Sequence, residues 1–254
     1  MKVIAIINQK GGVGKTTTSA NLGSAIAELG KKVTIIDLDP QGHLAVSLGV
    51  RKNQSGIDEV LTGEKSIQQQ IISLSDNLQL ITSGLKLKEI EQLTENRAHR
   101  GDLLKNALHE SLQDQDYVFI DCPPSSGLLI VNALFATDEI VIPMTSDFLA
   151  LQGLSHLMGT IKKFESLLKK QYVAWLVISR YTPNRKISKQ VLNMLLTYFP
   201  KQILATTIKE TTLLAECPSF GQSILEYRSG SRSAKEFRKL AIDFMEGRIM
   251  YGKK

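Results

Sequence analysis

Short apolar runs alternate with segments of helical periodicity along most of the chain. The runs lie at 2–8, 32–37, 78–82, 117–122, 139–144 and 172–179. Between most of them the apolar residues recur with helical spacing, as at 17–29 and 101–112. Near-continuous apolar runs are typical of strands buried on both faces, and their alternation with helices requires right-handed crossovers between parallel strands. The pattern therefore predicts an α/β fold, with a doubly wound and mostly parallel sheet flanked by helices.

The last helical pattern, at 233–250, is amphipathic. Its apolar residues recur at i, i+3, i+4 and i+7, and its basic residues lie elsewhere around the helix. Such a helix either covers the protein core or lies on a membrane surface, and we expect the first arrangement.

Composition fits one ordinary globular domain. The chain has 254 residues, of which 43% are hydrophobic and 22% charged, and no Pro- or Gly-rich linker divides it. We therefore expect a single domain over 1–254. The chain begins directly at the first predicted strand, so we expect no helix-turn-helix domain before it. The apolar run near the N-terminus is too short for a signal peptide, and no stretch approaches the roughly 20 apolar residues of a spanning helix. Cys122 and Cys217 have no metal-binding or disulfide-framework spacing, which favours a reducing cytoplasm.

Charge is distributed unevenly. Residues 1–150 hold 13 Lys and Arg against 18 Asp and Glu, a net charge of −5, whereas residues 151–254 hold 18 against 7, a net charge of +11. A solvated basic face accounts for part of such an excess, but it also favours a polyanionic partner, either nucleic acid or an anionic membrane.

A glycine-rich loop follows the first predicted strand and opens the first helix, which is the context of a phosphate-binding loop. Gln9 stands where the usual pattern begins with glycine, and Lys10 follows it. Glycine backbones let N–H groups converge on phosphates, and the helix N-terminus adds partial positive charge. Lys15 is placed to bind the β- and γ-phosphates, and the Thr16 hydroxyl to bind Mg²⁺. Thr17 adds a hydroxyl and an N–H for the α-phosphate.

Aspartates end two of the other predicted strands. Asp37 is the last residue of the second run and Asp39 follows it closely, while Asp121 lies near the end of the run at 117–122. A single Asp at a strand end is usually a turn or capping residue, but a magnesium nucleotide requires a nearby carboxylate of this kind. Together with the loop, these aspartates predict a magnesium–nucleotide site.

Three segments resemble those of a known family in both order and spacing. KGGVGKTT at 10–17, DLDPQG at 37–42 and DCPPSSG at 121–127 are similar to the deviant Walker A, switch I and Walker B–switch II motifs of the ParA/Soj/MinD ATPases. Weaker similarity at 80–84, 132–144, 150–154 and 215–227 extends the resemblance over nearly the whole chain. It implies a P-loop NTPase fold of the deviant Walker A, SIMIBI-like class that hydrolyses ATP with Mg²⁺.

The resemblance also implies roles for individual residues. Lys10 corresponds to the signature lysine, which crosses an ATP-dependent dimer interface to the partner's nucleotide, while Gly12 permits the close approach of the two subunits. Asp39 positions the attacking water, and Asp37 helps to hold Mg²⁺ through water. The implied catalytic residues are Lys10, Lys15 and Asp39, the implied metal ligands are Thr16, Asp37 and Asp121, and the nucleotide-binding residues are Lys10, Gly11, Gly12, Val13, Gly14, Lys15, Thr16 and Thr17.

Family members differ in cargo. ParA-like members bind DNA without sequence preference and respond to a ParB-like partner, MinD-like members bind membranes, and nitrogenase iron protein relatives share an iron–sulfur cluster. The cysteine positions do not fit the cluster, and the helix at 233–250 lies where partition proteins have a packing helix. We therefore expect a nucleoid-associated, cytoplasmic ATPase of chromosome or plasmid segregation, with a positioning ATPase recruited to a membrane or protein assembly as the alternative.

Basic residues near the end of the sixth run and before the last helix are the candidate DNA contacts. One departure from the family weakens this expectation, because Glu210 and Leu213 stand where partition proteins often have arginines. Either Lys209 and the basic clusters replace those arginines, or DNA binding is weaker than usual. The candidates are Arg180, Arg185, Lys186, Lys189, Arg228 and Arg232, with Lys235, Arg238 and Lys239 in the second cluster.

Overall fold

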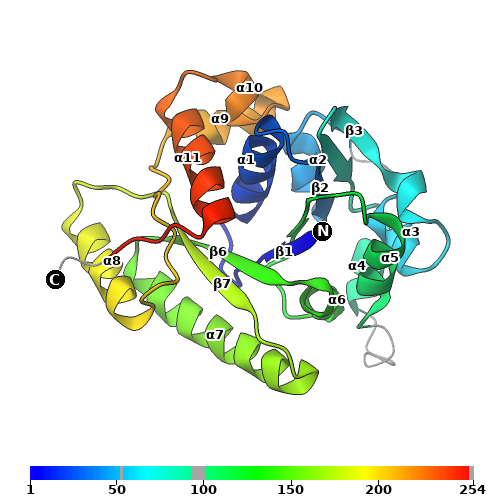
Figure 1. The fold of residues 1–254 in the computed structure, drawn as a ribbon, viewed down its shortest axis with the longest axis horizontal. Helices are drawn as coiled ribbons and strands as arrows, with labels where there is room; N and C mark the ends of the chain where they lie inside the picture. The colour runs from blue at the N-terminus through cyan, green and yellow to red at the C-terminus, as the bar shows by residue number, and fades with distance from the viewer. Residues whose placement is uncertain (52–53, 93–100, 252–254) are drawn as a thin grey trace.

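A seven-stranded sheet forms the centre of the molecule, with helices packed around it (Figure 1). The computed structural model describes residues 1–51, 54–92 and 101–251. The strand order is β3-β4-β2-β5-β1-β6-β7, and every neighbouring pair except β3 and β4 is parallel. This confirms the predicted doubly wound α/β fold. The strands are β1 (Lys2–Ile6), β2 (Val33–Asp37), β3 (Ile72–Ser75), β4 (Leu78–Ile81), β5 (Tyr117–Asp121), β6 (Glu139–Thr145) and β7 (Val173–Ser179).

Strand β3 was not predicted from the sequence. It pairs antiparallel with β4 at the edge of the sheet, and its residues alternate between half-buried and exposed. A four-residue edge strand with polar residues at every second position gives no apolar run, so hydrophobicity alone does not reveal it.

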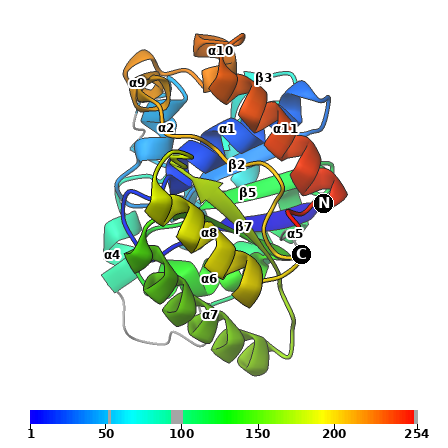
Figure 2. The same ribbon diagram turned by 90° about the vertical axis from the view of Figure 1, so that its left-hand side faces the viewer.

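Helices cover both faces of the sheet (Figure 2). Side chains of each inner strand alternate between the faces: Val3 and Ala5 enter one core, while Ile4 and Ile6 enter the other. The second core is covered by α1 (Lys15–Glu28), α2 (His43–Ser47), α9 (Thr212–Phe220), α10 (Ile224–Tyr227) and α11 (Arg232–Glu246). The first is covered by α3 (Ile57–Leu61), the 3₁₀ turn η1 (Ile67–Gln70), α4 (Leu87–Gln92), α5 (Leu103–Ser111), α6 (Leu128–Ala136), α7 (Phe148–Leu168) and α8 (Lys186–Tyr198).

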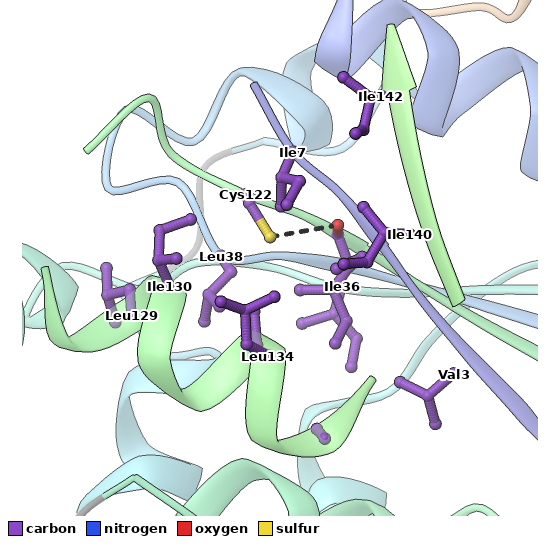
Figure 3. Packing of buried hydrophobic residues seen from close by; sticks show 14 of the residues in the cluster. Val3, Ile7, Ile36, Leu38, Cys122, Leu129, Ile130, Leu134, Ile140 and Ile142 are labelled. Atoms are coloured by element: carbon purple, nitrogen blue, oxygen red, sulfur yellow. Dashed lines mark hydrogen bonds between the residues drawn. The ribbon is translucent and has the colours of Figure 1, made fainter. Parts of the chain in front are cut away.

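Both cysteines are buried free thiols. Cys122 follows β5 and packs among Ile7, Leu38 and Leu134, where its Sγ donates to the Ile120 carbonyl (Figure 3). Burial raises the pKa of this thiol well above its usual value, so it stays protonated. The cysteines are therefore small core side chains, as predicted.

Helix α11 ends four residues before the predicted boundary. It stops at Glu246, because Gly247 adopts φ +65° and its N–H caps the last turn. The apolar residues Phe237, Leu240 and Phe244 are almost fully buried in the core that α11 shares with α1. The apolar face of α11 is thus part of the core, as the first interpretation predicted. Within the described residues, no helix is long and apolar enough to cross a membrane.

The pairing of β1, β2 and β5 brings the predicted site residues together. Asp37 pairs directly with Asp121 across β2 and β5, and Ile6 of β1 pairs with Asp121 on the other side. The loop that follows β1 therefore begins beside both aspartates. Crevices at the carboxyl ends of such strands are the usual ligand sites of open α/β sheets.

Candidate functional site

The glycine-rich loop joins β1 to the N-terminus of α1, as predicted. Gly12 and Gly14 have backbone φ values of +73° and +91°. Residues with a β-carbon rarely adopt positive φ values of this kind. Gly14 lies at the N-cap of α1, and the helix begins at Lys15. The loop therefore has the backbone conformation and the helix dipole that an anion site requires.

Lys15 is almost fully buried, with 8% of its surface exposed. Burial lowers the pKa of its ammonium group, while Asp121 and Asp39 oppose this change. A buried lysine between carboxylates is a strong point charge for a phosphate that enters the loop.

Asp121 is held by two hydroxyl groups of α1. Thr16 Oγ1 donates to one carboxylate oxygen at 2.7 Å, and Ser19 Oγ donates to the other at 2.9 Å. Burial raises the pKa of Asp121 to about 6. These contacts link the start of α1 to the end of β5. The sequence did not lead us to predict a role for Ser19. Its position one helical turn after Lys15 was the available signal.

Asp37 is fully buried and accepts N–H groups from the segment that follows β2. The donors are the backbone nitrogens of Asp39, at 3.2 Å, Leu44, at 3.1 Å, and Ala45, at 3.4 Å. Burial and the neighbouring Asp121 raise its pKa. The Asp37 carboxylate thus orders the segment that follows β2.

These oxygen atoms fit a magnesium nucleotide. Mg²⁺ prefers oxygen ligands and is usually bound by one or two protein groups together with phosphates and waters. Among the described residues no cluster of three or more His, Cys, Asp or Glu forms a protein-only metal site. Thr16 and Asp121, with Asp37 behind them, provide the smaller oxygen set that a nucleotide-bound Mg²⁺ needs.

Asp39 lies half-buried in a turn between β2 and α2. Its Oδ1 accepts the Gln41 N–H at 2.9 Å, and its carbonyl accepts the Gly42 N–H. Within the described residues, no hydrogen bond to its second carboxylate oxygen is present.

Lys10 makes an ion pair within its own chain that the sequence analysis did not anticipate. Its Nζ donates to both oxygens of Asp147 at 2.9 Å. Asp147 is also the N-cap of α7, where it accepts the Ala150 N–H at 3.0 Å. Asp147 follows β6, so the strand-end criterion applied to the other aspartates would have found it.

Two clefts flank the loop. The larger, of about 630 Å³, lies between the loop and residues 208–215, and apolar side chains of Ile208, Leu214 and Phe237 line part of it. The smaller, of about 280 Å³, is lined by Lys10, Asp147 and residues that follow β7. The phosphate loop thus opens on one side to a nucleoside-sized cleft and on the other to a charged one.

The candidate DNA contacts differ in their surroundings. Arg180 pairs with Glu210, and Arg232 with Glu236. Arg228 lies over the Tyr227 ring, 5.0 Å from its centroid. At the start of α8, by contrast, three side chains are exposed and form no ion pair within the described part of the chain: Arg185, Lys186 and Lys189.

Comparison with known proteins places this site in a family. A family model described as an AAA domain matches residues 1–173. The sporulation initiation inhibitor protein Soj of Bacillus subtilis is 36% identical, over 94% of this chain and 96% of Soj. The chain belongs to the ParA/Soj family of partition ATPases.

Solved structures of similar fold contain nucleotides. A putative plasmid partition protein of Borrelia burgdorferi, bound to AMPPNP, has a TM-score of 0.82 and 28% identity, covering 96% of this chain and 98% of its own. A cobyrinic acid a,c-diamide synthase of Mycobacterium smegmatis, bound to an ATP analogue and magnesium, has a TM-score of 0.83 and 29% identity, with full coverage of both chains. Proteins of different names share this fold. Membership of the ParA/Soj family therefore rests on the sequence relatives as well as on the fold.

Proposed function

We propose that this chain is a Mg²⁺-dependent ATPase that dimerises on binding ATP, holds non-specific DNA in that state, and acts in chromosome or plasmid segregation. A ParB-like partner stimulates hydrolysis and so releases the DNA. The protein would then be cytoplasmic and associated with the nucleoid. The observation that carries the proposal is the convergence of two loop lysines and three strand-end aspartates at one edge of the sheet.

The nucleotide would lie across the loop, with its base in the larger cleft. N–H groups of residues 11–17 and the Lys15 ammonium would hold the phosphates. Thr16 and Asp121 would hold Mg²⁺, which supplies electrostatic stabilisation of the phosphates when bound. Asp39 would orient the attacking water through its available oxygen.

Dimerisation would supply each nucleotide with a second lysine, from the opposite subunit. Lys10 lies at the loop edge, and apart from Gly12 and its two chain neighbours no described residue lies within 4 Å of where a β-carbon on Gly12 would be. That open space suits the approach of a second subunit, whose nucleotide Lys10 would then reach. A cation that arrives only in the dimer makes transition-state stabilisation, and hence hydrolysis, depend on dimerisation.

DNA binding would rest mainly on α8. Arg185, Lys186 and Lys189 gather at its N-terminus, where the helix dipole also favours phosphate. Such contacts carry affinity but no sequence information, as a protein that moves over a nucleoid requires. Arg228 and Arg232 would add weaker contacts from the surface between α10 and α11.

Retention on DNA tests the proposal. Full-length protein is incubated with random-sequence duplex DNA and ATP, ADP or no nucleotide, across a salt series, with Lys15→Ala as the nucleotide-binding control. We expect retention with ATP alone, and a salt slope that falls by about 0.9 for each phosphate contact removed from α8. An ATP-dependent dimer that is retained on anionic liposomes but not on DNA would instead support the membrane-positioning alternative.

A further inference from the structure

Glu210 binds the side chain of Arg180, one of the candidate DNA contacts. Arg180 donates from Nε and Nη2 to Glu210 Oε1, at 3.2 and 2.8 Å. The Thr182 hydroxyl donates to the second oxygen of Glu210. These contacts hold the pKa of Glu210 below its usual value, so the pair remains charged at neutral pH.

The Arg180 guanidinium also contacts the phosphate loop. Nη1 donates to the Gly12 carbonyl at 3.4 Å. Arg180 has φ +49°, an uncommon conformation for a residue with a side chain. Arg180 directly follows the last residue of β7, and its guanidinium turns toward the loop. Backbone strain of this kind commonly occurs at functional sites.

The preceding residue makes an equivalent contact. Ser179 Oγ donates to the Val13 carbonyl at 2.6 Å. Two successive loop carbonyls, of Gly12 and Val13, are therefore held by two successive residues at the end of β7.

Peptide geometry connects these contacts to phosphate binding. In a trans peptide the C=O of one residue and the N–H of the next point in opposite directions. Holding the carbonyls of Gly12 and Val13 toward β7 therefore directs the N–H groups of Val13 and Gly14 away from it. An anion site gains affinity when such N–H groups are oriented before the ligand arrives.

We propose that Arg180, held in place by Glu210, positions the phosphate loop for nucleotide and does not contact DNA. The inference rests on the proposed function, because it assigns a role within the same nucleotide site. The negative charge of Glu210 would repel DNA, but it suits a partner that fixes an arginine fork. Glu210 and Arg180 are thus positioning residues, which act on the nucleotide through the loop backbone.

Nucleotide affinity is the first measurement. Binding of Mg-AMPPNP to the full chain is measured by calorimetry for the wild type, Arg180→Ala, Arg180→Lys, Glu210→Ala and the Arg180→Ala/Glu210→Ala double variant. Loss of one charge-assisted contact at this exposure should weaken binding about fivefold. Lysine should not restore affinity, because an ammonium cannot bridge Glu210 and the loop as a guanidinium does. The double variant should bind no more weakly than Arg180→Ala alone.

Arg248 provides a matched control. Its side chain is 55% exposed, against 57% for Arg180, and it also pairs with a glutamate, Glu246 at the end of α11. Arg248→Ala should leave AMPPNP affinity unchanged. Thermal unfolding without nucleotide should give the same midpoint for Arg180→Ala and wild type, which would separate loop positioning from a loss of fold.

Retention on duplex DNA at saturating AMPPNP is the second measurement. Arg180→Ala should be retained as the wild type is, whereas Arg185→Ala should be retained less. Wild-type AMPPNP affinity in Arg180→Ala, or rescue of affinity by Arg180→Lys, would overturn the inference. A loss of DNA retention equal to that of Arg185→Ala would overturn it as well. If the wild type binds AMPPNP but not DNA, the proposed function fails, while the affinity series still decides the role of Arg180.

Discussion

Asp147 holds the ammonium group of Lys10 within a single chain, with 2.9 Å between Nζ and each carboxylate oxygen. In the proposed dimer Lys10 would leave this contact to reach the nucleotide of the second subunit. The ion pair would then favour the single chain and oppose dimerisation.

Replacing Asp147 with Asn should strengthen the ATP-dependent dimer. Asn keeps an oxygen for the N-cap of α7 but removes the charge that holds Lys10. Both side chains are more than a third exposed, so each pair is worth no more than about 1 kcal/mol. A dimer breaks two such pairs, so its dissociation constant should fall by about 2- to 30-fold. Sedimentation with ATP over a concentration series measures this change. A weaker dimer would show that Asp147 accompanies Lys10 into the interface. Lys10→Ala, as the companion variant, should lose the ATP-dependent dimer altogether.

Replacing Asp39 with Asn should slow hydrolysis and preserve the dimer. Asn retains the oxygen that accepts the Gln41 N–H, so the turn is kept, but an amide is a poor partner for the attacking water. We expect phosphate release to fall by about 100-fold or more, while sedimentation with ATP still shows the dimer. Phosphate release at the wild-type rate would exclude Asp39 from the chemistry.

The buried pair Asp37 and Asp121 should make the stability of the nucleotide-free protein depend on pH. The pKa of Asp121 rises from 3.8 to about 6, chiefly because of burial, so between these values the folded state keeps a proton that the unfolded chain has lost. By linkage, the contribution of Asp121 favours folding most at low pH and declines as the pH rises through about 6.

Asp121→Asn tests this sign. The amide replaces the carboxylate without a charge, so the variant should gain about 1 kcal/mol or more relative to wild type between about pH 4.5 and 7.5. Urea unfolding in EDTA without nucleotide measures the difference at each pH. Parallel pH profiles for the two proteins would contradict the prediction.

Helix α11 should behave as part of the core. Phe237 is fully buried against α1, so Phe237→Ala should lower the free energy of unfolding by about 3 to 4 kcal/mol. Lys239→Ala, on the exposed side of the same helix, should change it by less than about 0.5 kcal/mol. Chemical denaturation of both variants makes the comparison. A small effect of Phe237→Ala would mean that α11 detaches easily and is available to a surface.

Sequence patterns predicted the features that depend on apolar residues or on a few residues close together in the chain. The six buried strands and the phosphate loop were recognisable because burial and glycine spacing appear within short segments. The edge strand β3 was missed because its residues are only partly buried, and the end of α11 was misplaced because amphipathic spacing continues past Gly247.

Pairings over long sequence separations were not predictable in this way. Lys10 and Asp147 are 137 residues apart, and Arg180 and Glu210 are 30 apart. Each partner alone looks like a solvated charge. The neighbouring strands β1 and β6 bring Lys10 to Asp147, and an isolated parallel bridge between Tyr181 and Lys209 brings Arg180 to Glu210. Both contacts therefore depend on the folded chain.

The alignment of Asp37 with Asp121 makes the site sensitive to some changes of chain length and tolerant of others. Deleting one residue inside β2 or β5 would turn an aspartate to the opposite face of the sheet, and deleting two would move it about 7 Å along the strand. Insertions in the helical crossovers leave both carboxylates in place. Homologues should therefore vary in length between the strands, while the number of residues from the start of each strand to its aspartate stays constant.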